Sequence, residues 1–149
     1  MVPADTRWFR GRFFLAILAG PGTARTLEAM HRAHLLEKLV PAFSRVRGLM
    51  QFNQSHKYTV DEHTIRAIGI LSRIETGDLE EDHPLASKIV HKVLSRPVLY
   101  LAVLLHDIAK GRRGDHSVLG AEVAERLCPR LGLDAAQTLA VIEQLGLRK

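Results

Sequence analysis

Leu104-Leu105-His106-Asp107-Ile108-Ala109-Lys110-Gly111 is the stretch of the sequence that decides the fold. It closes an apolar run that begins after Pro97, and a helix that is apolar on every side belongs in the middle of a domain. The helix is expected to end at Gly111, because glycine commonly terminates helices. A histidine and an aspartate therefore lie side by side where a buried helix ends. Burying such a pair costs free energy unless its members are paired or bind a metal ion.

The sequence around this stretch predicts helices and no convincing strand. Capping boxes are expected at Thr59 with Glu62 and at Asp134 with Gln137, since these side chains satisfy free N–H groups at a helix start. The expected helices cover residues 8–19, 24–33, 35–40, 41–50, 60–76, 84–94, 97–110, 116–128 and 135–145. Other predicted signals are Thr23 as an N-cap, Gly77 as a helix end, Asp115 or Ser117 as a cap and Pro129 as a helix breaker.

Composition favours a helical globular domain. The 149 residues fit one domain, and 46% of them are hydrophobic while only 5% are aromatic, a balance that suits packed aliphatic helices. No apolar stretch is as long as a membrane span. Cys128 is the single cysteine and forms no internal disulfide, so the chain needs no oxidising compartment and is expected in the cytoplasm. The expected fold class is all-α, a helical bundle.

The charge pattern permits an anionic partner but not a nucleic acid. The net charge is +5, which is compatible with a nucleotide or a phosphorylated protein. Basic side chains are scattered, and aromatic residues are not interleaved with them as a stacking surface requires. Arginines precede an apolar run at residues 13–19, where an amphipathic helix is favoured over a signal peptide because the run is short.

Four residues are candidate metal ligands. His106 and Asp107 are adjacent, His63 lies upstream on a separate helix, and His116 follows in a Gly-Asp-His-Ser turn. Lys110, one helical turn after the pair, is a candidate contact for a phosphate oxygen. His63 is expected on the apolar face of its helix, a face that it shares with Ala67, Ile70 and Ile74.

The same residues have alternative roles without a metal. His63 and His106 are then core histidines, His116 supports a helix cap, and Asp107 and Lys110 form a surface pair. In the metal interpretation, mixed imidazole and carboxylate ligands suit Mn²⁺, Fe²⁺, Zn²⁺ or Mg²⁺. Such a site activates water and polarises a phosphoryl oxygen.

The motifs resemble those of the HD phosphohydrolase superfamily. More narrowly, three segments resemble the central region of the bifunctional PII uridylyltransferase/uridylyl-removing enzymes: residues 58–63, residues 104–111 and Gly114-Asp115-His116-Ser117. The segment from Thr23 to Met50 is also similar. The resemblance covers roughly residues 13 to 139 of this chain.

The resemblance implies a fold and a reaction. Residues 58–149 are implied to form an HD-type helical bundle, and residues 1–57 an N-terminal helical extension. His63, His106 and Asp107 are implied to bind a divalent metal, Mg²⁺ or Mn²⁺ first, with Fe²⁺ and Zn²⁺ as alternatives. His116 is implied as a second-metal or phosphate contact, and Asp107 and Lys110 as catalytic residues. The reaction implied is hydrolysis of the phosphodiester joining UMP to a tyrosine of the nitrogen-regulatory protein PII, so uridylylated PII is the implied partner.

The sequence departs from the family's pattern at its C-terminal end. The family continues after the position of Ala140 with a His-His pair and a last metal-binding Asp, and residues 141–149 contain neither. The family's nucleotidyltransferase and small-molecule-sensing domains have no counterpart in the sequence. We therefore expect a C-terminally truncated HD domain that hydrolyses phosphodiesters poorly. Two alternatives are an HD hydrolase of free nucleotides and a catalytically silent HD domain with a regulatory role.

Overall fold

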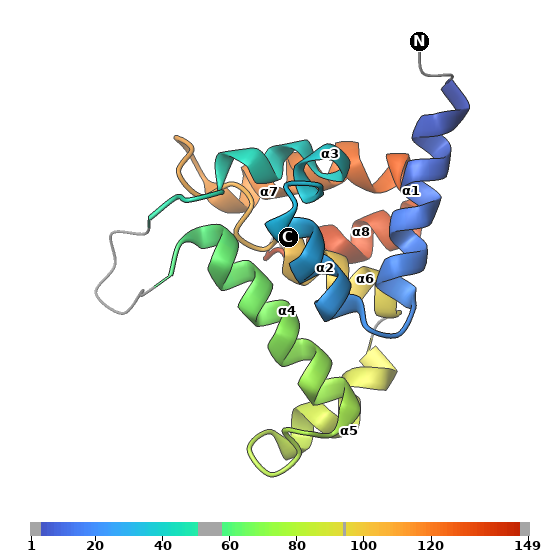
Figure 1. Ribbon diagram of the computed structural model, residues 1–149, viewed down its shortest axis with the longest axis vertical. Helices are drawn as coiled ribbons and strands as arrows, with labels where there is room; N and C mark the ends of the chain where they lie inside the picture. The colour runs from blue at the N-terminus through green and yellow to red at the C-terminus, as the bar shows by residue number, and fades with distance from the viewer. Residues whose placement is uncertain (1–3, 51–57, 94, 147–149) are drawn as a thin grey trace.

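The chain is all-α in the computed structural model, which describes residues 4–50, 58–93 and 95–146. These residues form α helices and one short 3-10 helix and contain no strand, which confirms the expected class (Figure 1). The elements are α1 (Ala4–Ala19), α2 (Thr23–Arg32), α3 (Leu36–Leu39), η1 (Pro41–Arg45), α4 (Val60–Thr76), α5 (Pro84–Val93), α6 (Arg96–Leu105), α7 (His116–Arg130) and α8 (Ala135–Gln144). The polar stretch 51–57 lies outside the described residues.

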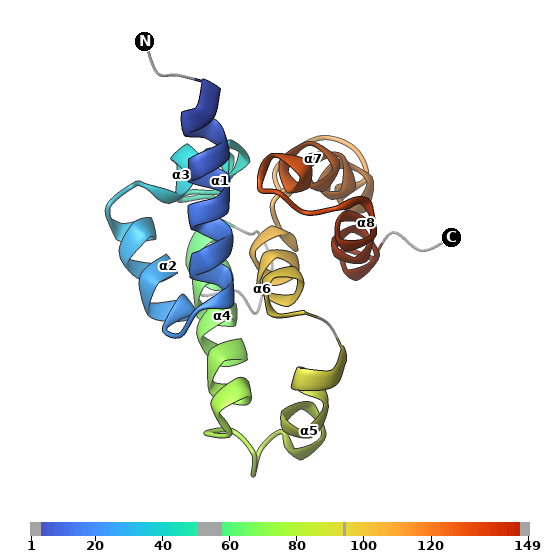
Figure 2. The same ribbon diagram turned by 90° about the vertical axis from the view of Figure 1, so that its right-hand side faces the viewer.

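Helix α6 occupies the middle of the bundle. Figure 2 shows it between α1 and α4 on one side and α7 and α8 on the other, and it contacts α1, α4 and α8. Its sequence explains the position, because a helix with apolar residues on most sides is stable only when other helices cover it. Its buried residues are Val98, Tyr100, Leu101, Ala102, Leu104 and Leu105, as the apolar run predicted.

The N-terminal helices contribute to the same hydrophobic core. Phe14 of α1, Leu27 of α2 and Phe43 of η1 are fully buried in one cluster with Leu101 and other side chains of α4, α6, α7 and α8. Removing these aromatic and aliphatic side chains from water provides most of the driving force for folding. The sequence predicted an N-terminal extension at residues 1–57 and an HD domain at residues 58–149. Described residues of both segments contribute side chains to the same hydrophobic core.

Helix α4 ends where the sequence predicted, but its buried face differs from the prediction. Gly77 has a φ of 85°, so it terminates the helix in the left-handed conformation that glycine adopts without strain. Ile70, expected on the apolar face with His63, is 49% exposed. The buried face instead carries Val60, Asp61, Thr64, Ile68 and Leu71. His63 thus faces the edge of the core.

Two predicted signals at helix starts are absent. Thr59 is the N-cap of α4, but its side chain forms no capping hydrogen bond, so the predicted box with Glu62 is wrong. Thr23 is the first residue of α2 rather than its N-cap, which is Gly22. The Thr23 hydroxyl donates instead to the carbonyls of Ile17 and Gly20, both at 2.9 Å. It thereby supplies a hydrogen-bond donor to backbone carbonyls at the C-terminal end of α1.

The start of α7 and the capping box of α8 follow the prediction. Asp115 caps α7 by accepting from the backbone N–H groups of Ser117 and Val118, and Asp134 and Gln137 form the predicted capping box. Pro129 does not break α7, because the helix continues one residue further to Arg130. The helix expected over residues 41–50 is shorter than predicted, since η1 ends at Arg45 and the chain continues in turns.

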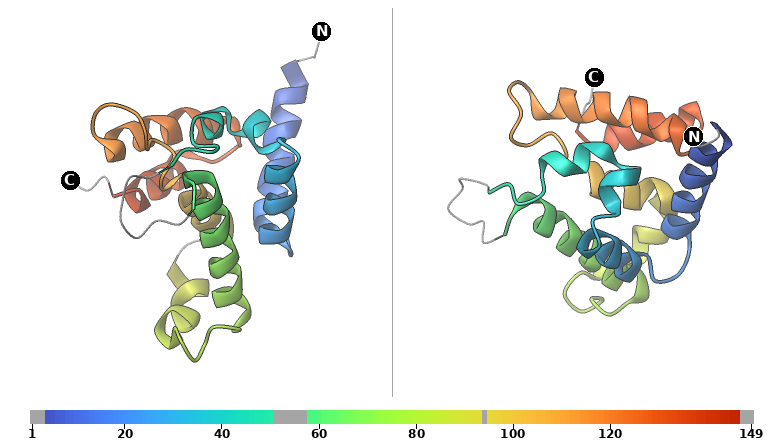
Figure 3. Two further views of the ribbon diagram at one scale, coloured as in Figure 1. Left: turned by 60° about the vertical axis from the view of Figure 1, so that its left-hand side comes forward. Right: turned by 45° about the horizontal axis from the view of Figure 1, so that its top comes forward.

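Helices α4 and α5 form an arm of the structure. The two helices pack against each other, and Figure 3 shows α5 beside the far end of α4, away from α7 and α8. None of the described helices is long and apolar enough to cross a lipid bilayer.

Candidate metal centre

The His-Asp pair lies in a turn that follows α6. The helix ends at Leu105, earlier than the predicted end near Gly111, and tighter i+3 hydrogen bonds continue from it. Ile108 N–H donates to Leu105 O and Lys110 N–H to Asp107 O, both at 3.1 Å. Ile108 is buried in the core and anchors the turn. The anchored turn leaves His106 and Asp107 at the edge of the core.

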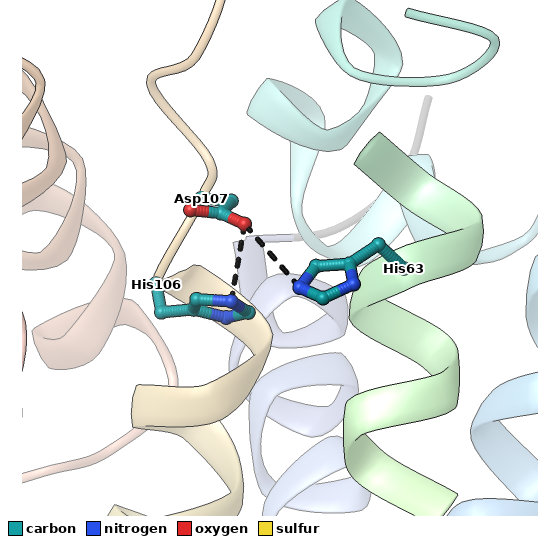
Figure 4. A group of neighbouring side chains, drawn as sticks. All are labelled: His63, His106 and Asp107. Atoms are coloured by element: carbon teal, nitrogen blue, oxygen red, sulfur yellow. Dashed lines mark ion pairs between the residues drawn. The ribbon is translucent and has the colours of Figure 1, made fainter. Parts of the chain in front are cut away.

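The turn brings its two ligand candidates close to His63 of α4. Asp107 Oδ2 lies 3.1 Å from His106 Nε2 and 3.9 Å from His63 Nε2 (Figure 4). The two imidazole rings lie 5.8 Å apart between centroids. Figure 4 shows the His63 side chain pointing from α4 towards the other two. The three side chains predicted as ligands therefore meet, although His63 and His106 are far apart in the sequence.

The His106 ring is oriented for coordination through Nε2. Its Nδ1 lies 2.5 Å from the carbonyl oxygen of Val103. Since a carbonyl only accepts hydrogen bonds, Nδ1 is the donor to Val103. Nε2 donates to Asp107 while the ring is protonated and offers its lone pair to an ion once that proton leaves. A backbone carbonyl that fixes the tautomer in this way is the usual support of a metal-binding histidine. His106 is also partly exposed, which excludes the alternative of a core histidine.

Asp107 is the electrostatic centre of the group. Its side chain is 12% exposed, and burial raises the pKa of its carboxyl, but the hydrogen bond with His106 and the charges of His106, Lys110 and His63 outweigh burial and hold the pKa below its ordinary value. The same hydrogen bond with Asp107 raises the pKa of His106, although burial opposes the shift. Asp107 is thus a carboxylate held between two imidazole rings and the ammonium group of Lys110.

The donor set fits a divalent metal ion. The ligand atoms of His63, His106 and Asp107 all lie within 4.8 Å of one another, and no other group of three or more histidine, cysteine or acidic side chains in the described residues has this spacing. Two ligands of one ion, each about 2.0–2.2 Å from it, are at most about 4.4 Å apart. Small side-chain rotations therefore suffice for common coordination. Three protein ligands leave further positions for water or substrate, as in catalytic sites.

Of the two other predicted site residues, Lys110 lies beside the His63, His106 and Asp107 group and His116 is not part of it. Lys110 is close, because its Nζ is 3.6 Å from Asp107 Oδ1. The alternative Asp107–Lys110 pair is therefore present, but it adjoins the two histidines rather than standing alone. His116 is the first residue of α7, is exposed, and does not belong to the three-residue ligand group.

Comparison with known proteins identifies the family. The family model of the HD domain matches residues 60–145, a segment that contains His63, His106 and Asp107. The chain belongs to the HD domain family. No solved structure matches the chain.

The HD chain is also similar to curated bacterial enzymes. It is 62% identical over 126 residues to the bifunctional uridylyltransferase/uridylyl-removing enzyme of Novosphingobium aromaticivorans, covering 84% of this chain and 14% of that protein. It is 56% identical over 131 residues to the enzyme of the same name in Azospirillum brasilense, covering 87% of this chain and 14% of that protein. The chain thus spans about 14% of the length of the curated relatives it matches.

A buried network that the local sequence pattern did not predict supports His63 in this HD domain. Asp61, two residues before His63, is only 4% exposed. Its Oδ2 lies 2.7 Å from His31 Nε2, and its Oδ1 accepts from Gly48 N–H at 3.0 Å. Burial raises the pKa of Asp61, but hydrogen bonds, including those from His31 and Gly48, lower it to a net value below the ordinary one. Asp61 therefore ties the first turn of α4 to α2 and to the turn after η1.

Metal binding should weaken as the pH falls. A metal ion needs the neutral His106 ring, and the contact with Asp107 raises the pKa of that ring above its ordinary value of 6.5, so protons compete already near neutrality. We expect the apparent Mn²⁺ affinity to fall by about tenfold per pH unit below this pKa, for one displaced proton. Titrations with Mn²⁺ across the neutral range measure the slope. An affinity that stays constant from neutral to mildly acidic pH would contradict a role of His106 as ligand.

Proposed function

We propose that this HD domain is a metal-dependent phosphohydrolase of the phosphodiesterase type, the uridylyl-removing part of an enzyme that modifies PII. The observation that carries the proposal is the convergence of His63, His106 and Asp107 within ligand distance of one another. The relatives' printed name, uridylyl-removing enzyme, supports the choice of reaction. The substrate proposed is the phosphodiester between UMP and a tyrosine of PII. The buried free thiol of Cys128 is compatible with the reducing cytoplasm as the compartment.

The proposed ligands are His63, His106 and Asp107, with Mg²⁺ or Mn²⁺ as the preferred ion. A bound divalent ion lowers the pKa of water and polarises a phosphoryl oxygen. Asp107 supplies the negative charge that offsets the ion, and the carbonyl of Val103 holds the His106 ring in place. His116, at the start of α7, is proposed as a further contact to phosphate or to a second ion.

Lys110 is proposed to stabilise the charge that develops on the phosphoryl group. Its ammonium group is 3.6 Å from Asp107 and therefore lies beside the proposed ion site. A compact cation at this place can hold a phosphoryl oxygen while the oxygen of a water molecule bonds to phosphorus and the tyrosine oxygen leaves, taking up a proton that the water gives off. The ion pair with Asp107 keeps the flexible lysine side chain near the reacting atoms before substrate binds.

The proposed function is tested by release of UMP from uridylylated PII. The purified chain is incubated with Mn²⁺ and uridylylated PII at high enzyme concentration, and UMP is measured by chromatography. We expect release that disappears in the His63→Ala variant. Binding of metal without any UMP release would reject the proposed reaction, and hydrolysis of free nucleotides alone would assign the alternative substrate class.

The substitution Lys110→Met should lower turnover more than metal affinity. We expect a loss of roughly 100-fold in kcat, the scale for removing one donor to a developing negative charge. Mn²⁺ affinity should stay within a fewfold of the parent value, because lysine is not a ligand. Lys88→Met, on the exposed surface of α5, is the matched control and should leave turnover unchanged. Equal kcat in the two variants would remove Lys110 from the proposed catalytic residues.

A further inference from the structure

Four arginines surround a pocket that the proposed metal centre does not use. The pocket has a volume of about 420 Å³ and lies between η1 and the second half of α7. Arg45 ends η1, Arg112 follows the metal-site turn, and Arg126 and Arg130 lie one turn apart on α7. None of the three candidate metal ligands lines it.

The four arginines of this pocket are not held in ion pairs by the described residues. None of the four arginines forms an ion pair with a described carboxylate; Glu122 is the acidic group that acts on Arg112 from α7. The Nε atom of Arg112 is buried without a hydrogen-bond partner among the described residues. Burial and then the charges of Arg45 and Arg126 lower the pKa of Arg112. Like charges held together in this way repel one another, and a bound anion relieves the repulsion.

The pocket also has an apolar side. Val40, Val123 and Leu127 are buried and line it together with Pro41 and Ala42. A volume of about 420 Å³ falls in the range of small-molecule sites, which combine an apolar lining with a few charged groups. Guanidinium groups bind phosphate through paired hydrogen bonds, and several of them around one pocket match an anion with more than one phosphate. An apolar wall beside them suits the base or sugar of a nucleotide.

We propose that this arginine pocket binds a nucleotide through its phosphates, at a site separate from the metal centre. The concave shape and buried apolar wall favour a small ligand over an extended acidic peptide. The proposal does not depend on the hydrolase reaction, since it rests on Arg45, Arg112, Arg126 and Arg130.

The pocket is connected to the metal centre through one loop. A second pocket beside it is lined by Arg45, Lys110, Arg112 and Arg113. Lys110 is the residue paired with Asp107, so the segment from residue 110 to residue 113 carries one residue beside the metal centre and one, Arg112, in the arginine pocket. A nucleotide bound to Arg112 would therefore restrict the loop that positions Lys110. This connection gives the bound nucleotide a route to influence the metal centre.

Binding of ATP to the chain tests the proposal. Isothermal titration is carried out in buffer freed of divalent ions by a chelating resin, so that the metal centre does not contribute. We expect saturable one-to-one binding that Arg126→Gln weakens by roughly tenfold or more, the scale for hydrogen bonds to a charged group. Arg73→Gln, on the exposed surface of α4, carries the same charge change and should leave the affinity unchanged.

Three outcomes would overturn the proposal. They are no saturable binding of ATP, equal weakening by Arg126→Gln and Arg73→Gln, and displacement of ATP by a poly-glutamate peptide that binds more tightly. The last outcome would assign the pocket to an acidic protein segment. Circular dichroism of both variants establishes that their helices are intact, so a lost affinity reports on the pocket.

Discussion

Replacement of Asp107 by alanine is expected to weaken Mn²⁺ binding by roughly 100-fold or more, because even residues outside the ligand shell cost 10- to 100-fold when removed. Asp107 is the only carboxylate among the three proposed ligands and lies 3.1 Å from His106 Nε2 and 3.9 Å from His63 Nε2. Without it, two imidazoles and the nearby ammonium of Lys110 face the ion, and the remaining electrostatics repel it. Isothermal titration with Mn²⁺ measures the loss.

The helical fold should survive this substitution. Asp107 lies in a turn whose anchor is Ile108, and the side chain itself is at the edge of the core. Asp82→Ala, in the exposed turn between α4 and α5, is the matched control for loss of one carboxylate and should bind Mn²⁺ like the parent chain. Circular dichroism of both variants checks the fold. Similar affinities of the two variants would show that Asp107 is not a ligand.

The central helix and most helix limits were predictable because the signals are local. The apolar run before His106 implies a covered helix wherever it occurs, and Gly77 and Asp134 act through their own backbone or the next turn. Thr23 shows where local signals fail. Its hydroxyl has two uses, as an N-cap for α2 or as a donor to the end of α1, and the tertiary fold selects the second. The pattern alone does not distinguish them.

The convergence of the site was predicted, but not the geometry that produces it. Adjacent residues on a regular helix point about 100° apart, which separates His106 from Asp107. The structure avoids this separation by ending α6 at Leu105, and the burial of Ile108 then orients the turn. The buried network of Asp61 was missed for a related reason. Asp61 precedes Glu62 in a pattern typical of exposed first turns, whereas its partner His31 lies on another helix.

A second long-range network joins three helices at the opposite end of α4. Glu75 accepts two hydrogen bonds from the Arg96 guanidinium, at 2.7 and 3.0 Å, and one from the Tyr100 hydroxyl at 2.5 Å. Arg96 also donates to the backbone carbonyls of Leu18 and Gly20, where α1 ends. Burial and then the hydrogen bond with Glu75 raise the pKa of Tyr100 to about 12, so its hydroxyl stays protonated and donates. Glu75 thus connects the ends of α1, α4 and α6.

The substitution Glu75→Ala is therefore expected to destabilise the chain by roughly 2–4 kcal/mol, slightly less than the full cost of breaking a buried ion pair because Arg96 is partly exposed. The Glu75 side chain is only 9% exposed, and its loss removes the carboxylate that accepts hydrogen bonds from both Arg96 and Tyr100. Urea unfolding followed by circular dichroism measures the free energy of unfolding. Glu80→Ala, in the exposed turn after α4, is the matched control and should change the free energy of unfolding by less than about 0.5 kcal/mol.

The substitution Tyr100→Phe removes one hydrogen bond of the network and should lower the free energy of unfolding by about 1 kcal/mol. A free energy of unfolding for Glu75→Ala equal to that of Glu80→Ala would mean that the network does not hold the three helices together.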